Sequence, residues 1–74
     1  MKLSDLEIGE KASIVSIDAD SELRNRLHSF GIATGEELEV KGHSLAKRTI
    51  EIDIDRTLIA LRKEEADRIA VEKV

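Results

Sequence analysis

The chain has 74 residues, of which 41% are hydrophobic and 38% are charged, with no Cys, Trp or Tyr and a single Phe. This composition excludes disulfides and thiolate metal sites, and the length leaves room for one domain, residues 1–74, held together by hydrophobic burial alone. A net charge of −4 argues against nucleic-acid binding, because surfaces that follow phosphates are basic.

The N-terminal segment shows no targeting signal. Met1 to Asp5 does not resemble a charged leader followed by an apolar stretch, and no later run is long and apolar enough to span a bilayer. We therefore expect a soluble cytoplasmic protein that meets a membrane only through a partner.

The first predicted element is a strand at Lys11 to Ile17, a segment rich in β-branched residues. Its apolar positions do not alternate perfectly, which either a bulge or burial of both faces would explain. Asp18 to Ser21 is then expected to form a turn, with Ser21 as the N-cap of a helix.

The helix is predicted from Glu22 to Phe30, with Gly31 leaving it in a left-handed conformation. Leu23, Leu27 and Phe30 lie at positions i, i+4 and i+7, which places them on one stripe of the helix surface. All three side chains are expected to face the core.

The second half of the chain predicts a series of strands. Residues 36–42 and 48–53 alternate between apolar and polar, and a loop over residues 43–47 joins them. A two-residue turn at Asp55 and Arg56 then leads into a strand at residues 57–61. A helical turn over residues 63–68 and a short strand at Ile69 to Val71 close the chain.

This order of elements predicts a mainly β fold with one inserted short helix. Short strands in hairpin connections cannot form a parallel sheet, and closure into a barrel removes exposed edges. The predicted architecture is an SH3-like small barrel.

The same residues resemble the ferrous iron transport protein A (FeoA) family over nearly the whole chain. The matching pieces are Leu3-Ser4-Asp5-Leu6 with Gly9, Ile14-Val15-Ser16-Ile17, Leu23 with Arg26-Leu27, Phe30-Gly31-Ile32 with Gly35, Glu37-Leu38-Glu39-Val40, Ile50-Glu51-Ile52, Ala60-Leu61-Arg62-Lys63-Glu64-Glu65-Ala66 and Ile69-Ala70-Val71. The sequence departs from the family at His43 to Arg48, where a Gly-Asp-Pro stretch is common, and at Thr34, where a Pro is common.

The resemblance implies an SH3-like fold and a cytosolic accessory role in bacterial ferrous iron uptake, exerted on the cytosolic GTP-hydrolysing domain of the transporter FeoB. It also implies similarity to the C-terminal domain of iron-dependent repressors, so a metal-responsive regulatory domain is a second hypothesis. The chain begins at Met1 with no winged-helix segment before it, which favours the free-standing protein. A third hypothesis is self-association through a sheet edge, and we expect a monomer or weak homo-oligomer.

Enzymatic chemistry and a cofactor are not expected. The sequence lacks Cys and Tyr, and it shows no Gly-rich phosphate loop and no nucleophile elbow. His28 and His43 are the only histidines, and neither belongs to a paired ligand motif. We expect solvated histidines, with His28 on the helix and His43 in a loop, rather than a tight Fe(II) site.

Two segments are candidate partner surfaces. Lys41, His43, Lys47 and Arg48 form a positive stretch on an acidic chain, which fits either an ordinary solvated loop or a contact with an acidic face of a partner. The strand at residues 57–61 is apolar on both faces, so we expect burial of both. An exposed Ile59 beside Leu45 or Ala33 would instead mark an apolar docking patch.

Overall fold

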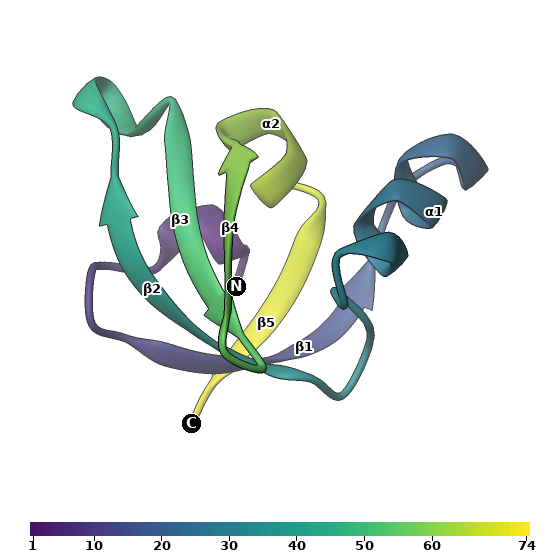
Figure 1. Ribbon diagram of the computed structural model, residues 1–74, viewed down its shortest axis with the longest axis horizontal. Coiled ribbons are helices and arrows are strands. Elements are labelled where there is room, and N and C mark those ends of the chain that lie inside the picture. The colour runs from purple at the N-terminus through teal and green to yellow at the C-terminus, as the bar shows by residue number, and fades with distance from the viewer.

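The computed structural model describes residues 1–74 and shows an antiparallel sheet of five strands that curls around its core (Figure 1). The strands lie in the order β4-β3-β2-β1-β5. In chain order, the elements are η1 (Leu3–Asp5), β1 (Lys11–Ile17), α1 (Ser21–Ser29), β2 (Glu37–His43), η2 (Leu45–Lys47), β3 (Thr49–Ile54), β4 (Thr57–Arg62), α2 (Lys63–Ala66) and β5 (Ile69–Lys73). The predicted mainly β class, with one inserted helix and a closing helical turn, is confirmed.

The core follows from the alternation of the strands. In β3, Ile50, Ile52 and Ile54 are buried, while the residues between them are exposed or half-buried. The core contains seventeen buried apolar residues, contributed by every strand, both α-helices and η1. Successive side chains of a strand point to opposite faces, so the alternating sequence predicts that the apolar residues of β3 face the core. The burial pattern confirms this prediction.

Strand β1 is shared between the two halves of the sheet. It pairs with β2 over Lys11 to Ser13 and with β5 over Ala12 to Ile17, and the register with β5 shifts between Ile14 and Ser16. Val15, between them, is exposed. A bulge, rather than burial of both faces, therefore explains the imperfect alternation, and the bend that a bulge brings suits a strand at which the sheet curls.

The β3–β4 hairpin turns through two residues with left-handed backbones. Asp55 has a φ of 50° and Arg56 a φ of 65°, and Ile54 pairs with Thr57 on either side of them. Positive φ at both central positions is the geometry of a type I′ turn, whose twist matches that of the paired strands. The predicted two-residue turn is confirmed.

Helix α1 begins one residue earlier than predicted. Its N-cap is Asp20, whose carboxylate accepts a hydrogen bond of 2.9 Å from the backbone N–H of Leu23, so Ser21 is the first helical residue. Gly31 has a φ of 87°, which confirms its role as the left-handed residue after the helix.

The prediction that three helix residues face the core is only partly correct. Leu27 is fully buried and the half-buried Leu23 packs against the core, whereas the side chain of Phe30 is 40% exposed. Phe30 is the C-cap, where the helix ends, and after Gly31 the chain turns so that Ile32 enters the core instead.

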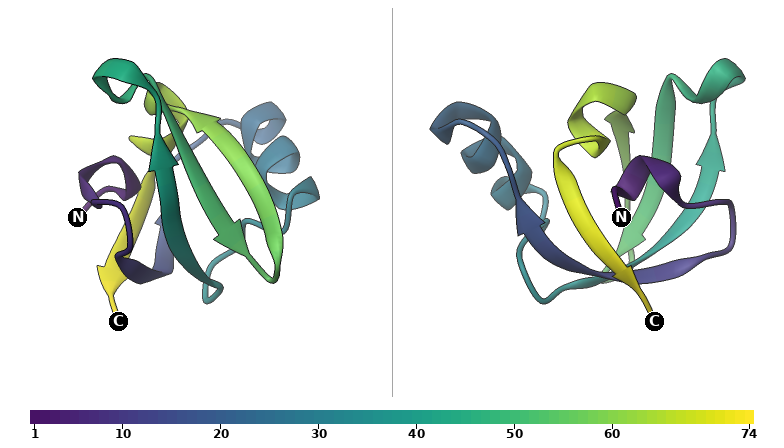
Figure 2. Two further views of the ribbon diagram at one scale, coloured as in Figure 1. Left: turned by 60° about the vertical axis from the view of Figure 1, so that its left-hand side comes forward. Right: turned by 180° about the vertical axis from the view of Figure 1, so that it is seen from behind.

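The two edges of the sheet are treated differently. Lys2 forms a β-bridge with Ala70, and Met1 and Val71 exchange backbone hydrogen bonds, so the N-terminal segment lies along β5 (Figure 2). Strand β4 pairs only with β3. The expectation that barrel closure removes the sheet edges is therefore wrong for β4.

No helix in the structure combines the length and the apolar character that crossing a membrane requires.

Candidate partner-binding surface

The positive segment predicted from the sequence is largely neutralised by the protein's own carboxylates. Lys41 Nζ lies 3.3 Å from Glu39 Oε2, and Lys47 Nζ lies 3.0 Å from Glu7 Oε1. All four side chains are at least partly exposed, so each pair is weak. The two lysines nevertheless offer less free charge to a partner than the sequence indicates.

His43 does not lie in a loop. Strand β2 extends through it, opposite Ile50 of β3, and the loop that follows contains the short helix η2. The residue is half-buried, and its Nε2 atom is buried with no hydrogen-bond partner. His43 is therefore not the fully solvated side chain that the sequence predicted, because strand pairing draws it into the sheet.

His28 lies in the last turn of α1 and is exposed, as predicted. Helix α1 and the end of β2 lie on opposite sides of the barrel, so the two histidines do not come together (Figure 1). No group of three or more His, Asp or Glu side chains is arranged to hold a metal ion.

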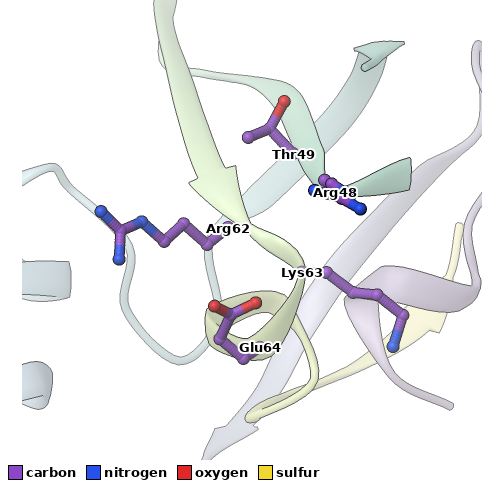
Figure 3. A pocket seen from close by; sticks show the side chains of 5 residues that line it. All are labelled: Arg48, Thr49, Arg62, Lys63 and Glu64. Carbon is purple, nitrogen blue, oxygen red and sulfur yellow. The ribbon is translucent and has the colours of Figure 1, made fainter. Parts of the chain in front are cut away.

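Arg48 is the member of the positive segment that remains free. It lines a shallow depression at the open end of the β3–β4 hairpin together with Thr49, Arg62, Lys63 and Glu64 (Figure 3). Arg62 reaches to one side of the end of β4 and Lys63 to the other, with Arg48 beside Thr49 (Figure 3). We call Arg48, Arg62 and Lys63 the basic corner.

The basic corner carries uncompensated charge. Lys63 Nζ is 3.0 Å from Asp67 Oδ2, but neither Arg48 nor Arg62 makes an ion pair. The two arginine head groups are therefore available to an external carboxylate, which arginine can bind through two parallel hydrogen bonds.

Two residues of the basic corner were missed from the sequence. Thr49 pairs with Arg62, and the N–H of Lys63 donates to the carbonyl of Arg48 at 2.9 Å. A two-residue turn at Asp55 and Arg56 places residue 54 opposite residue 57 and residue 53 opposite residue 58, and the same pairing continues along both strands. The predicted turn therefore already contained the signal that Arg48 and Lys63 are neighbours.

The apolar candidate surface at residues 57–61 also differs from the prediction. Ile59 is 7% exposed and belongs to the core, so its side chain is not available to a partner. The expected burial of both faces of β4 is wrong as well, because Leu58 is 61% exposed and Ala60 is exposed. Leu58 and Ala60 share the outer face of a strand whose inner face meets the core.

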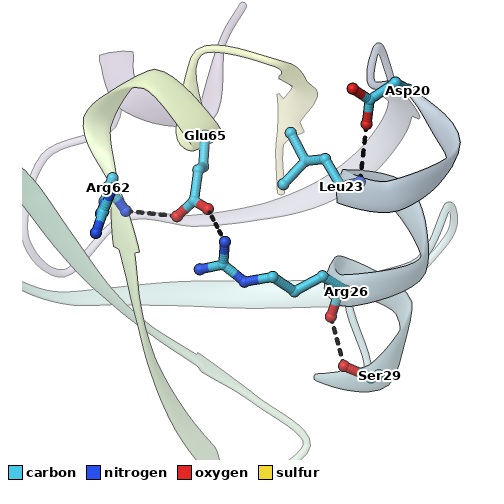
Figure 4. A network of polar contacts seen from close by, with 6 residues as sticks. All are labelled: Asp20, Leu23, Arg26, Ser29, Arg62 and Glu65. Atoms are coloured by element: carbon cyan, nitrogen blue, oxygen red, sulfur yellow. Dashed lines mark hydrogen bonds and ion pairs between the residues drawn. The ribbon is translucent and has the colours of Figure 1, made fainter.

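A polar network connects α1 to the end of β4. Glu65, which is almost fully buried, accepts a 2.9 Å hydrogen bond from the backbone N–H of Arg62, and its other oxygen lies 2.8 Å from Arg26 Nη1 (Figure 4). Arg26 belongs to α1, and its guanidinium reaches across to Glu65 of α2. This network positions Arg62 and fixes the helix beside the barrel.

The two carboxylates whose pKa is shifted are structural. A hydrogen bond from Lys73 and one from the backbone of Glu7 hold the pKa of Glu10 below its ordinary value. Hydrogen bonds from Ser4 and then Lys63 lower the pKa of Asp67. Both carboxyl groups are stabilised as anions, which is the opposite of what a general acid working near neutral pH requires.

Comparison with known proteins connects this geometry to a family. The FeoA domain model matches residues 1–73. The chain is 39% identical over 74 residues to a Campylobacter jejuni protein named "Putative Fe(2+) transport protein A", and the match covers all of both chains.

Solved structures of FeoA proteins are similar to this chain in fold. The iron(II) transport protein A from Clostridium thermocellum is 39% identical, with a TM-score of 0.95, covering all of this chain and 46% of that one. FeoA from Stenotrophomonas maltophilia, described as a prokaryotic SH3 domain protein and solved with zinc, is 28% identical, with a TM-score of 0.84, covering 97% of this chain and 89% of that one.

A manganese-dependent transcriptional repressor shares the fold with a TM-score of 0.91, but it is only 24% identical and the match covers 36% of its chain. This likeness extends to the fold alone. With the family model matching nearly every residue, the chain belongs to the FeoA family, an accessory family of Fe(2+) transport, and it has the SH3-like fold.

Proposed function

We propose that this protein is a non-enzymatic docking module that binds the cytosolic domain of a FeoB-type ferrous iron transporter. The observation that carries the proposal is the match of residues 1–73 to the FeoA domain and of the whole chain to an Fe(2+) transport protein of the same length. In keeping with that role, the protein acts on the cytoplasmic side of the membrane and reaches the membrane only through its partner.

The basic corner is the contact that we propose for this partner. Arg48 and Arg62 are close together and unpaired on a chain whose net charge is −4, so an acidic surface would be attracted to this place. Complementary charge of this kind raises the association rate and sets orientation more than it adds affinity. Binding should therefore weaken as ionic strength rises.

Titration of the purified cytosolic domain of the transporter with this protein tests the proposal, with and without guanine nucleotide. Arg48→Gln should weaken binding about two- to fivefold, the range for one exposed charge pair. Lys41→Gln should have a smaller effect, because Lys41 already faces Glu39. Lys11→Gln, which makes the same charge change on an exposed β1 residue without an ion pair, is the matched control.

Absence of binding to the transporter domain in either nucleotide state would contradict the proposed function. Binding that is insensitive to Arg48→Gln and to salt would support the proposed partner, but it would show that the basic corner is not the contact surface. A difference in affinity between the two nucleotide states would show that docking biases the transporter, since a ligand shifts an equilibrium only through unequal affinity for its two states.

A further inference from the structure

The edge of β4 that pairs with no other strand is a second surface, which shares only Arg62 with the basic corner. An edge strand presents a row of unpaired backbone groups, and proteins usually cover, bend or charge such an edge. Here the N-terminal segment covers the other edge, at β5, through the bridge of Lys2 with Ala70. No segment of the chain covers β4 in this way.

The hairpin register identifies the free groups. The two-residue turn makes Ile54 and Thr57 a hydrogen-bonded pair, and such pairs recur at every second residue. The N–H and C=O groups of Leu58 and Ala60 therefore point away from β3. Neither residue takes part in any hydrogen bond outside the strand ladder, whether to backbone or to side chains.

Between its charged ends, strand β4 lacks three of the devices that prevent an edge from pairing, namely a register shift, a proline and an inward charge. Its register with β3 runs without a shift from Thr49–Arg62 to Ile54–Thr57, whereas the registers of β1 with β5 and of β2 with β3 are both interrupted. The strand contains no Pro, and its inward residues are the buried Ile59 and Leu61 rather than charges. A regular, unprotected edge of this kind is a template for one more strand.

The charges along β4 distinguish between possible occupants. Arg56 directly precedes the strand and Arg62 is its last residue; neither makes an ion pair, and no carboxylate lies between them in the sequence. In a second copy paired so that Leu58 meets Ala60, Arg56 would stand opposite Arg62, which is unfavourable. A strand with acidic residues at its ends meets opposite charges at both positions.

We propose that β4 binds, by backbone pairing, an extended segment of a partner protein that is apolar at its centre and acidic at both ends. The centre of the segment would lie beside Leu58 and Ala60, and its carboxylates beside Arg56 and Arg62. Backbone hydrogen bonds would contribute the affinity, and the two arginines would fix the position of the segment along the strand. The inference does not depend on which protein carries the segment, and it does not require docking on FeoB, with which it shares only Arg62.

A labelled peptide Glu-Glu-Val-Thr-Val-Glu-Glu tests the inference through fluorescence anisotropy and amide hydrogen exchange by NMR. The amides of Leu58 and Ala60 should exchange rapidly in the free protein and slowly in the complex. A peptide with Lys in place of Glu should bind at least about tenfold more weakly. Methylation of those backbone nitrogens of the peptide that face β4 should abolish binding. This experiment needs no change to the protein.

Two matched pairs of variants test the protein side. Ala60→Pro removes the outward N–H but no ladder hydrogen bond, and should weaken binding at least about tenfold, while Ala60→Val keeps that donor and should bind normally. Arg62→Gln should weaken binding about threefold and reduce its salt dependence. Lys11→Gln should change neither the affinity for the peptide nor its salt dependence.

Several results would overturn the inference. They are failure of the acidic peptide to bind, binding that leaves exchange at Leu58 and Ala60 unchanged, and equal binding by the Lys peptide or the N-methylated peptide. Concentration-dependent dimers that protect these two amides without peptide would show that a second copy covers β4 instead. Each result is independent of whether the transporter domain binds.

Discussion

Single side chains at the end of α1 show how burial depends on where the helix stops. Leu27 and Phe30 occupy the same predicted stripe, yet Leu27 is fully buried and Phe30 is 40% exposed. The difference arises because Phe30 caps the helix and the chain then turns at Gly31. Leu27 is therefore the main hydrophobic anchor of this short helix, whose own length is too small to make it stable in isolation.

Leu27→Ala should lower the free energy of unfolding by about 2–5 kcal/mol, because it removes a fully buried side chain and leaves a cavity. Phe30→Ala should cost less than about 1.5 kcal/mol, because much of that ring already contacts water. Urea denaturation of both variants measures the difference. Equal losses would mean that Phe30 packs as the sequence predicted.

Buried Glu65 illustrates a second residue-scale effect. Its carboxylate joins the backbone N–H of Arg62 to the guanidinium of Arg26, two groups that are far apart in the sequence. A nearly buried carboxylate needs such partners, since an unpaired one would pay a large desolvation penalty. The composition of the chain shows many carboxylates, but it does not identify the one that is buried.

At the scale of elements, the β3–β4 hairpin organises both proposed binding surfaces. Its register brings Arg48 to Lys63 at the open end and directs the backbone of Leu58 and Ala60 outward along the edge. The turn that sets this register contains Arg56 in a left-handed conformation. A side chain with a Cβ atom adopts that conformation at a cost of about 1–2 kcal/mol.

Arg56→Gly should therefore raise the free energy of unfolding by about 0.5–1 kcal/mol, part of the relieved strain being offset by the greater freedom of glycine in the unfolded chain. Arg56→Ala is the control, because it removes the same charge but keeps the Cβ atom. Thermal denaturation of both variants tests the turn assignment. Similar gains in both would indicate that charge, rather than backbone conformation, limits the turn.

For the molecule as a whole, polar contacts secure the two ends of the chain to the barrel. Lys73 Nζ lies 2.6 Å from Glu10 Oε2, and the hydroxyl of Ser4 donates to Asp67, which also pairs with Lys63. Glu10 and Asp67 are the two carboxyl groups whose pKa is lowered. Both contacts require ionised carboxylates, so they make the fold sensitive to acid.

The stabilisation from Asp67 should be complete above its ordinary pKa of 3.8 and should disappear as the pH falls through the lower value of the folded state. Asp67→Asn should therefore be less stable than the parent protein at about pH 7, and the difference should shrink at about pH 2.5. Asp18→Asn, which changes an exposed carboxylate without an ion pair, is the control. A stability difference that does not change with pH would contradict this linkage.

Local patterns in the sequence determined most of the fold. The alternation in β3, the two-residue turn at Asp55 and Arg56 and the glycine after α1 depend on neighbouring residues, and each was predicted correctly. The same patterns, together with the family resemblance, indicated the SH3-like barrel. They also indicated the location of Arg48, the one predicted contact residue that is both exposed and free of ion pairs.

Only the tertiary structure decided which residues are available at the surface. Lys47 loses its free charge to Glu7, forty positions away, and β2 draws His43 into the sheet. The N-terminal segment covers β5 but leaves β4 open, although both strands are short and apolar in sequence. Ion pairing, burial and edge protection depend on distances between segments remote along the chain, and those distances exist only once the barrel has formed.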